Sequence, residues 1–294
     1  MPSPGPAKPP PVTGPKRGRP PAPIDRNAGP AHRALLEPVR TVLFSQGTTL
    51  DDVVERSGYS RTRISELLRG VGYFPAWEMV FSVVRSLQLP IPPLRRLWIA
   101  AAREAGRAEH WIRNGLDQVA HPGEPPPPAH AGFTLQVEAA YADYARAFLL
   151  TDSRTNYVVS ESFDMLWVLW DDATTNENLH RYAWELFRSR VMTRAPRHHD
   201  GRLDLRAAVF STRELHDHAA TPGHLVDLTE LIDLFDAITR LSDSHMDVAV
   251  LHHLCGLPQE RIAQVLGRTP AYTHSVDHHA RFVVETFLTP PTPE

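Results

Sequence analysis

The segment LDDVVERSGYSRTRISELLRG (Leu50–Gly70) contains two short amphipathic stretches that are separated by a glycine. Thr49 precedes the first stretch and Ser60 precedes the second, and both residue types are preferred caps of helix N-termini. Gly58 lies between the stretches, where a tight turn favours a residue that tolerates a positive φ. The pattern predicts two short helices joined by a tight turn, which is the arrangement of a helix-turn-helix.

The second predicted helix carries polar side chains on its outer face. In a helix-turn-helix this helix enters the DNA major groove, where arginine binds guanine through two hydrogen bonds and serine or threonine contacts either base type. Arg61, Thr62 and Ser65 share the outer face, whereas Arg63 and Arg69 are better placed for phosphates. The candidate DNA-binding residues are Ser60, Arg61, Thr62, Arg63, Ser65 and Arg69. The alternative is a helical bundle with a basic face that reads no sequence.

The flanking residues extend this pattern. LDDVVERSGYSRTRISELLRGVGYFPAWEMVFSVVRSL (Leu50–Leu87) resembles the Cro/phage-repressor family of DNA-binding domains, which is also called XRE-like. The resemblance implies a repressor-like domain of five helices, and we expect it to span residues 32–120. One departure is Val54, because the family prefers alanine where the two helices cross.

The N-terminal residues 1–31 are dominated by proline, glycine and small side chains, which cannot form a core. We therefore expect a disordered, basic tail. Within it, Arg17, Gly18 and Arg19 resemble the core of an AT-hook, which lies in a narrow minor groove whose negative potential attracts arginine. The alternative is a basic tail that binds DNA without sequence preference.

Apolar residues recur at helical spacing through the rest of the chain, so the predicted fold class is all-α. The segment HPGEPPPPAHAG interrupts this pattern and predicts a stiff linker between two halves. Beyond the repressor-like domain, the predicted parts are a linker over 121–132, a helical region over 133–200, a connector over 201–227, a second helix-turn-helix module over 228–288 and a tail over 289–294.

The second half resembles another family of bacterial transcription proteins. The segment LPQERIAQVLGRTPAYTHSVDHHARFVVETFL (Leu257–Leu288) completes a resemblance to domain 4 of extracytoplasmic-function sigma factors, and Val137–Arg194 resembles their domain 2. VVSESFDMLWVLW (Val158–Trp170) stands where that family has its core-polymerase-binding helix. HRYAWELFRSRVM (His180–Met192) stands where it has its promoter-opening helix.

The predicted recognition helix of this second module has few cations, although the family carries several there. Its one nearby cation is Arg281, and affinity for DNA depends largely on phosphate neutralisation. We therefore expect a degenerate sigma-like module that serves protein contact or dimerisation, and a working sigma factor is the alternative. If this module binds DNA, the candidate residues are Tyr272, Thr273, His274 and His278.

Charge is divided unequally along the chain. Residues 1–107 hold 16 Lys and Arg against 8 Asp and Glu, a net of +8, whereas residues 108–294 hold 15 against 26, a net of −11. The basic part suits double-stranded DNA and the acidic part is repelled by it.

The single cysteine excludes an intrachain disulfide and fits a reducing interior. No apolar run approaches the roughly 20 residues that span a bilayer, so we expect no contact with a membrane. The predicted location is the cytoplasm, in association with the nucleoid.

The motifs of nucleophilic, metal-dependent and phosphate-binding enzymes are missing, so we expect neither an enzyme nor a cofactor. The sixteen histidines include adjacent pairs, but adjacent residues on an α-helix do not face each other. His252 and Cys255 have zinc-compatible spacing without a matching second pair, so no metal site is expected.

The combined prediction is a bacterial, sequence-specific transcriptional regulator that binds DNA through its N-terminal domain. Its second half is expected to contact RNA polymerase, a regulatory protein or a second copy of the chain. The alternatives are a sigma-like initiation factor and a sigma antagonist that does not bind DNA.

Overall fold

The computed structural model describes residues 22–119, 121, 123–205 and 228–288. Over these residues the chain is helical, and its only β-bridge joins Arg197 to Leu203. The all-α fold class predicted from the sequence is therefore confirmed. In the same ranges, no helix combines the length and the apolar character needed to cross a membrane.

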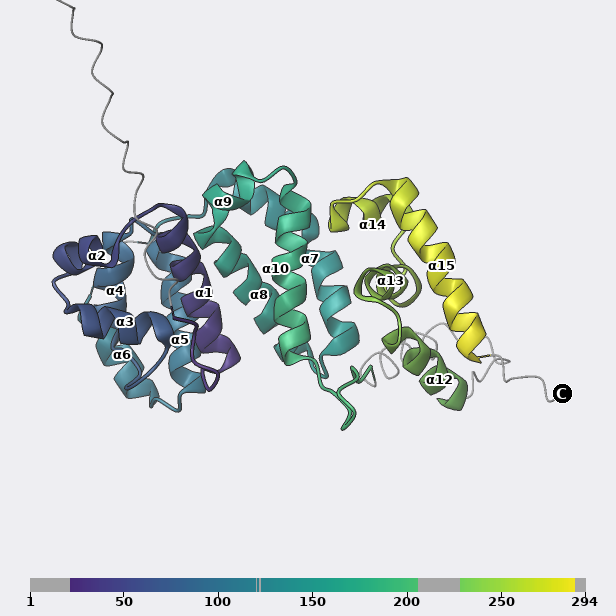
Figure 1. The fold of residues 1–294 in the computed structure, drawn as a ribbon, viewed down its shortest axis with the longest axis horizontal. Helices are drawn as coiled ribbons and strands as arrows, with labels where there is room; N and C mark the ends of the chain where they lie inside the picture. Colours follow the sequence, from purple (N-terminus) through teal and green to yellow (C-terminus); the bar gives the residue numbers. More distant parts are fainter. Residues whose placement is uncertain (1–21, 120, 122, 206–227, 289–294) are drawn as a thin grey trace, which may run out of the picture.

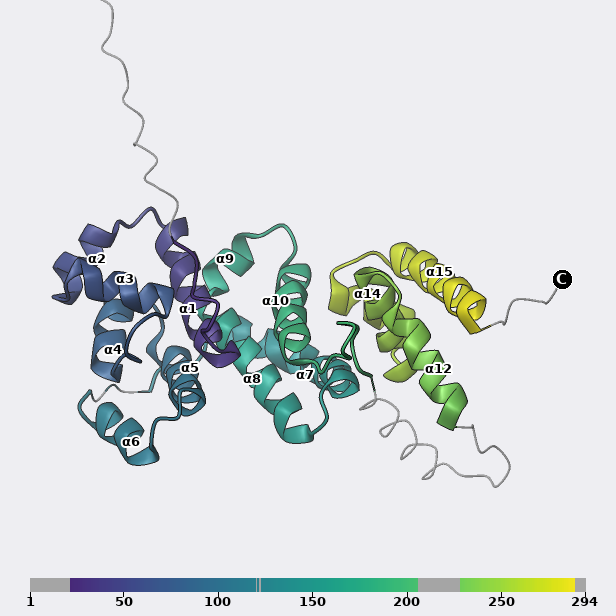
Figure 2. The same cartoon turned by 60° about the horizontal axis from the view of Figure 1, so that its bottom comes forward.

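The helices form three consecutive units, which lie in a row in Figure 1 and in Figure 2. The N-terminal unit contains α1 (Pro30–Ser45), α2 (Leu50–Ser57), α3 (Arg61–Arg69), α4 (Trp77–Ser86), α5 (Ile91–Glu104) and α6 (Glu109–Asp117). The middle unit contains α7 (Pro128–Phe148), α8 (Asp152–Val168), α9 (Trp170–Thr175) and α10 (Leu179–Arg194). The C-terminal unit contains α12 (Leu228–Thr239), α13 (Asp243–Ala249), the π-helix η1 (Val250–Leu254), α14 (Gln259–Leu266) and α15 (Pro270–Leu288).

The described side chains form two hydrophobic cores, and helix α8 contributes to both. The first core belongs to the N-terminal unit but includes Met165 and Val168 of α8. The second core joins the middle unit to the C-terminal unit and includes Val158 and Leu166 of the same helix. The N-terminal and middle units therefore share a buried helix instead of being separate bodies joined by a linker.

Ion pairs reinforce this shared helix. Arg96 on α5 donates to both carboxylate oxygens of Asp164 on α8, and its Nε lies 3.0 Å from each oxygen. Arg190 on α10 is buried and reaches α1. Its Nη1 donates to Glu37 at 2.8 Å and its Nη2 donates to the carbonyl oxygen of Pro30 at 2.7 Å. Since buried charges need partners, these contacts fix one orientation of α1 and α5 against the middle unit.

The N-terminal unit begins before the predicted boundary at residue 31. The backbone N–H of Asp25 donates to the carbonyl oxygen of Arg69 at 2.8 Å, so the chain is already packed there. Helix α1 begins at Pro30, a residue that suits the first helical position because its nitrogen carries no hydrogen. The carboxylate of Glu104 accepts a hydrogen bond from the N–H of Ala31 at 3.0 Å and so caps the helix from another element.

The predicted linker over residues 121–132 is also shorter than expected. Helix α7 begins at Pro128, and His130 in its first turn is buried. The imidazole ring of His130 lies between Trp167 and Trp170, with centroid distances of 5.9 and 5.1 Å. Proline is compatible with a helix start, so composition alone placed this boundary wrongly. The predicted C-terminal tail and residues 206–227 of the predicted connector lie outside the described residues.

The described N-terminal unit has six helices, so the prediction of five helices was wrong. Helix α5 ends before Gly106, whose φ of 69° lies in the left-handed region, and α6 follows. On α6, Ile112 is buried and Trp111 packs beside Trp98 with their ring centroids 5.6 Å apart. This sixth helix packs against α4 and α5 and so completes the first core.

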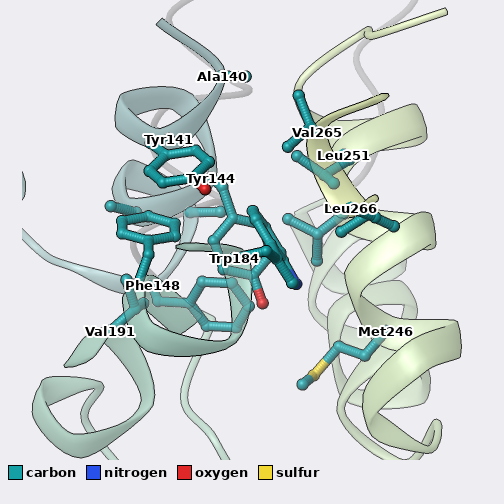
Figure 3. Packing of buried hydrophobic residues seen from close by; sticks show 14 of the residues in the cluster. Ala140, Tyr141, Tyr144, Phe148, Trp184, Val191, Met246, Leu251, Val265 and Leu266 are labelled. Carbon is teal, nitrogen blue, oxygen red and sulfur yellow. The ribbon is translucent and has the colours of Figure 1, made fainter. Parts of the chain in front are cut away.

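The middle and C-terminal units meet through large side chains. Figure 3 shows Tyr141, Tyr144 and Trp184 on the middle unit facing Leu251 and Leu266 on the C-terminal unit. The rings of Tyr144 and Trp184 are 4.7 Å apart in an edge-to-face arrangement, which aromatic pairs prefer. The apolar side chains of this contact belong to the second core.

A buried carboxylate lies inside this apolar contact. Asp247 on α13 accepts hydrogen bonds from the hydroxyl of Tyr144 at 2.6 Å, from Nε1 of Trp184 at 3.3 Å and from Nε of Arg188 at 2.7 Å. The guanidinium of Arg188 also pairs with the exposed carboxylate of Asp243 at 3.0 Å. Three donors from α7 and α10 therefore determine where α13 lies.

Replacement of Asp247 by alanine is expected to destabilise the protein by about 3–5 kcal/mol, because the half-buried Arg188 loses its main partner. The matched control is Asp243→Ala, whose carboxylate is exposed and should contribute less than about 1 kcal/mol. Urea unfolding monitored by tryptophan fluorescence measures both effects. Equal losses in the two variants would contradict the assignment of Asp247 as the central contact.

Stability should also decrease in mild acid. Burial lowers the pKa of several imidazoles, which are His32, His130, His180, His245 and His253. These histidines stay neutral in the folded protein, whereas the unfolded chain binds protons as the pH falls below about 6.5. The contribution of these histidines to the free energy of unfolding is therefore fully present above that pH and decreases towards pH 5.5. His130→Gln should reduce this slope in urea unfolding measured over the same pH range.

Candidate nucleic-acid interface

Helices α2 and α3 are the two short helices joined by a tight turn that the sequence predicts. Thr49 caps α2, because its hydroxyl accepts from the N–H of Asp52 at 3.2 Å while its own N–H donates to the Asp52 carboxylate at 2.8 Å. The Thr49 hydroxyl also donates to the Asp52 carboxylate at 2.7 Å, and this hydrogen bond, together with the one from the Thr49 N–H, holds the pKa of Asp52 below its ordinary value. Gly58 ends α2 with a φ of 74°, and no atom lies within 4 Å of a Cβ built on it. The turn is therefore open and depends on glycine for its backbone conformation.

Helix α3 turns its apolar side towards the core and its basic side towards solvent. Ile64 is buried in the first core, while the hydroxyl of Ser60 caps the helix by accepting from the N–H of Arg63 at 3.4 Å. The predicted contact residues Ser60, Arg61, Thr62, Arg63 and Arg69 are all exposed, and Ser65 is half-buried. The structure therefore brings the predicted residues together on one helix, with Ser65 the least accessible.

The guanidinium of Arg61 is held by one partner, the carboxylate of Asp51 on α2. Both side chains are largely exposed, at 61% and 75%. Such exposed pairs contribute only about 0–1 kcal/mol, so an incoming phosphate or base edge competes readily for Arg61. Asp51 is not among the residues that the sequence pattern predicts for this interface. Its role beside Arg61 depends on the angle between the two helices, which the pattern does not reveal.

Helix α3 lies at the end of the molecule away from the C-terminal unit, with α1 and α5 between it and the middle unit (Figure 1). It packs against α1 and α2. The chain that enters from the N-terminus runs beside its last turn, where Arg40 donates to the carbonyl oxygens of Leu68 and Ala22, each at 2.8 Å. The predicted minor-groove residues Arg17, Gly18 and Arg19 lie outside the described residues.

The second helix-turn-helix, formed by α14 and α15, has a similar backbone but a different environment. Gly267 ends α14 with a φ of 60°, as Gly58 ends α2. The carbonyl oxygen of Gly267 accepts from the side-chain amide of Asn178 at 3.0 Å. A Cβ built on Gly267 would lie 2.5 Å from the backbone nitrogen of Arg181. This turn is docked on the start of α10, whereas the first turn is free.

One residue predicted for the second module does not fit a DNA contact. Thr273 is completely buried, and its hydroxyl donates to the carbonyl oxygen of Pro270 at 3.0 Å, so the prediction that it contacts DNA was wrong. The reason is helical periodicity, which puts Thr273 on the same buried side of α15 as Val276 and Ala280. Tyr272, His274 and His278 are exposed.

Comparison with known proteins finds no match to a family model, to a curated protein or to a solved structure.

Gly58→Ala is expected to destabilise the N-terminal unit by about 1–2 kcal/mol, because a left-handed backbone is strained for a residue with a Cβ. Crowding plays no part in this effect, since the space around Gly58 is open. The control is Gly132→Ala in α7, which has open space and no positive φ and should raise stability by about 0.5–1 kcal/mol. Thermal unfolding of the two variants checks the opposite signs.

Proposed function

We propose that this protein is a bacterial, sequence-specific DNA-binding transcriptional regulator that reads its operator with helix α3. The proposal rests on one observation, which is the exposed basic face of α3 at the free end of the molecule. Of the exposed arginines on α3, Arg61 pairs with Asp51, whose carboxylate is itself exposed and is easily displaced by a phosphate or base edge. A basic helix with that accessibility suits the major groove.

Position along α3 assigns the contacts. Residues at the N-terminal end of a recognition helix reach base edges, so Arg61 and Thr62 are the proposed base-reading residues. Arg63 and Arg69 are proposed to bind phosphates and so to set the position of the helix in the groove. Ser65 is half-buried and is expected to contribute less.

The division of charge supports the same orientation on DNA. The net charge is +8 over residues 1–107 and −11 over residues 108–294. In Figure 1 the C-terminal unit lies at the opposite end of the row from α3. DNA therefore attracts the end that carries α3 and repels the other end, which favours one direction of approach.

The C-terminal unit is proposed to serve protein contact or dimerisation. Near the end of α15, Phe282, Phe287 and Leu288 are exposed, at 62%, 47% and 44%. Exposed apolar side chains that gather on one element are typical of protein interfaces. A second copy of the chain bound there would present two α3 helices, as twofold-symmetric operators require.

The sigma-factor alternative is less well supported. The helix that stands in the position of the family's core-polymerase-binding helix is α8, whose Met165 and Val168 are buried against the N-terminal unit. Polymerase would reach this surface only after the ion pair between Arg96 and Asp164 had broken and the first core had opened. That cost favours a regulator over an initiation factor.

The test begins with selection of a preferred duplex from random DNA by the full-length protein, followed by fluorescence anisotropy at physiological salt. Arg61→Ala should weaken binding to the selected duplex by roughly 5- to 150-fold, the equivalent of about 1–3 kcal/mol. Arg69→Ala should weaken binding to all duplexes. It should also reduce the number of counterions released on binding, measured from the salt dependence of the affinity, by about one. Asp51→Ala should strengthen binding, because it frees Arg61.

The matched control is Arg113→Ala, which removes an exposed arginine from α6 in the same unit. It should leave affinity for the selected duplex unchanged. Wild-type affinity in both Arg61→Ala and Arg63→Ala would contradict the proposal and favour an antagonist that does not touch DNA. Promoter-specific initiation with core RNA polymerase would instead favour the sigma-like alternative.

A further inference from the structure

A cluster of nitrogen and oxygen atoms joins η1 to α15 in the C-terminal unit. Nδ1 of His252 lies 3.0 Å from Oδ1 of Asp277, and Nε2 of His253 lies 2.8 Å from the same oxygen. The two histidines are adjacent in sequence, yet they converge because one uses its near ring nitrogen and the other its far one. They lie on a π-helix, a rare conformation that often marks functional sites.

Hydrogen bonding within this cluster cannot be satisfied by the protein atoms as they lie. Nδ1 of His252 is close to Asp277 and is also 3.1 Å from Nε2 of Gln259. A ring nitrogen either donates or accepts, so it cannot donate to the carboxylate and accept from the amide at once. In addition, Oε1 of Gln259 is buried and accepts no hydrogen bond. Rotation of the Gln259 side-chain amide by a half-turn exchanges the positions of its nitrogen and oxygen, so that Oε1 points at Nδ1 of His252.

We propose that His252, His253 and Asp277 bind one divalent transition-metal ion of the zinc class, with Oε1 of Gln259 as the fourth ligand. Zinc accepts imidazole nitrogen and oxygen ligands at about 2.0–2.2 Å, so the ligand atoms of a tetrahedral site are about 3.3 Å apart. The separations between Oδ1 of Asp277 and the nitrogens of His253 and His252, 2.8 and 3.0 Å, are within a few tenths of an ångström of that edge. Nε2 of Gln259 lies 3.1 Å from Nδ1 of His252, so the half-turn of the amide brings Oε1 within reach of the same site. The ligand atoms of His252, His253 and Asp277 all lie within 4.8 Å of one another, so side-chain rotations can bring them to tetrahedral spacing.

The surroundings of the cluster suit a metal ion. The second carboxylate oxygen of Asp277 lies 3.4 Å from Nε of Arg281, which holds the carboxylate with its first oxygen towards the histidines. Asp277 is buried, whereas His252 and His253 are partly exposed, so an ion enters from solvent past the imidazoles.

The protonation states agree with this role. Burial raises the pKa of Asp277, but the hydrogen bond from His252 and the neighbouring imidazoles outweigh it and hold the pKa below its ordinary value. Burial lowers the pKa of His253. Metal ions bind the deprotonated carboxylate and the neutral imidazole, so both shifts are in the direction that favours binding.

The site would connect two elements of the second helix-turn-helix module. η1 follows α13 directly, and α15 is the long helix that carries the exposed Tyr272, His274 and His278. A bound ion would tie η1 to α15 at Asp277 and would stabilise the C-terminal unit in proportion to its occupancy. This role is independent of DNA reading by α3.

The experiment uses the full-length protein without a histidine tag, freed of metal by a chelator and titrated with zinc sulfate in a calorimeter. We expect one zinc ion per chain, a higher melting temperature with zinc, and visible absorption typical of tetrahedral Co²⁺ when cobalt replaces zinc. His253→Ala should weaken zinc binding at least about tenfold, and Asp277→Asn should weaken it further. The control His278→Ala, which removes an exposed histidine from α15, should bind zinc as the wild type does.

His253 is partly exposed, so its alanine variant should fold even if Asp277→Asn does not, and circular dichroism checks this. The proposal is overturned if the wild type shows no stoichiometric zinc binding. It is equally overturned if folded His253→Ala binds zinc with wild-type affinity, since the cluster would then be an ordinary network of histidines and a carboxylate.

Discussion

The burial of α8 between two cores is the constraint on which the rest of the structure depends. Met165 packs with the N-terminal unit and Leu166 with the middle unit, so neither unit can complete its core without this helix. Arg96 and Arg190 add ion pairs across the same junction. Exposing the apolar side chains of α8 to water would cost free energy, so α1 and α5 stay packed against the middle unit. Helix α3 is therefore left at the free end.

The two helix-turn-helix motifs illustrate how similar local signals acquire different surroundings. Gly58 and Gly267 both have left-handed backbones at the ends of short helices. The first turn has open space around it, whereas the second accepts a hydrogen bond from Asn178 and touches the backbone of Arg181. The first motif keeps the outer face of α3 accessible, whereas the turn of the second motif packs against the middle unit.

The cluster of His252, His253 and Asp277 arises from a local departure from α-helical geometry. The expectation that adjacent histidines diverge holds for an α-helix, but η1 is a π-helix and the two rings use different nitrogens. Asp277 comes from α15, 24 and 25 residues further along the chain. A pattern search that looks for ligands at short spacings cannot find such a set.

The sequence by itself determined the all-α class, the caps at Thr49 and Ser60, and the exposed face of α3, because these depend on helical periodicity and on hydrogen bonds between residues close in the chain. Tertiary structure alone decided that α8 belongs to two cores, that Asp51 partners Arg61, and that the second turn is docked on α10. These features join residues far apart in sequence or depend on the angle between helices. Local patterns carry no information about either.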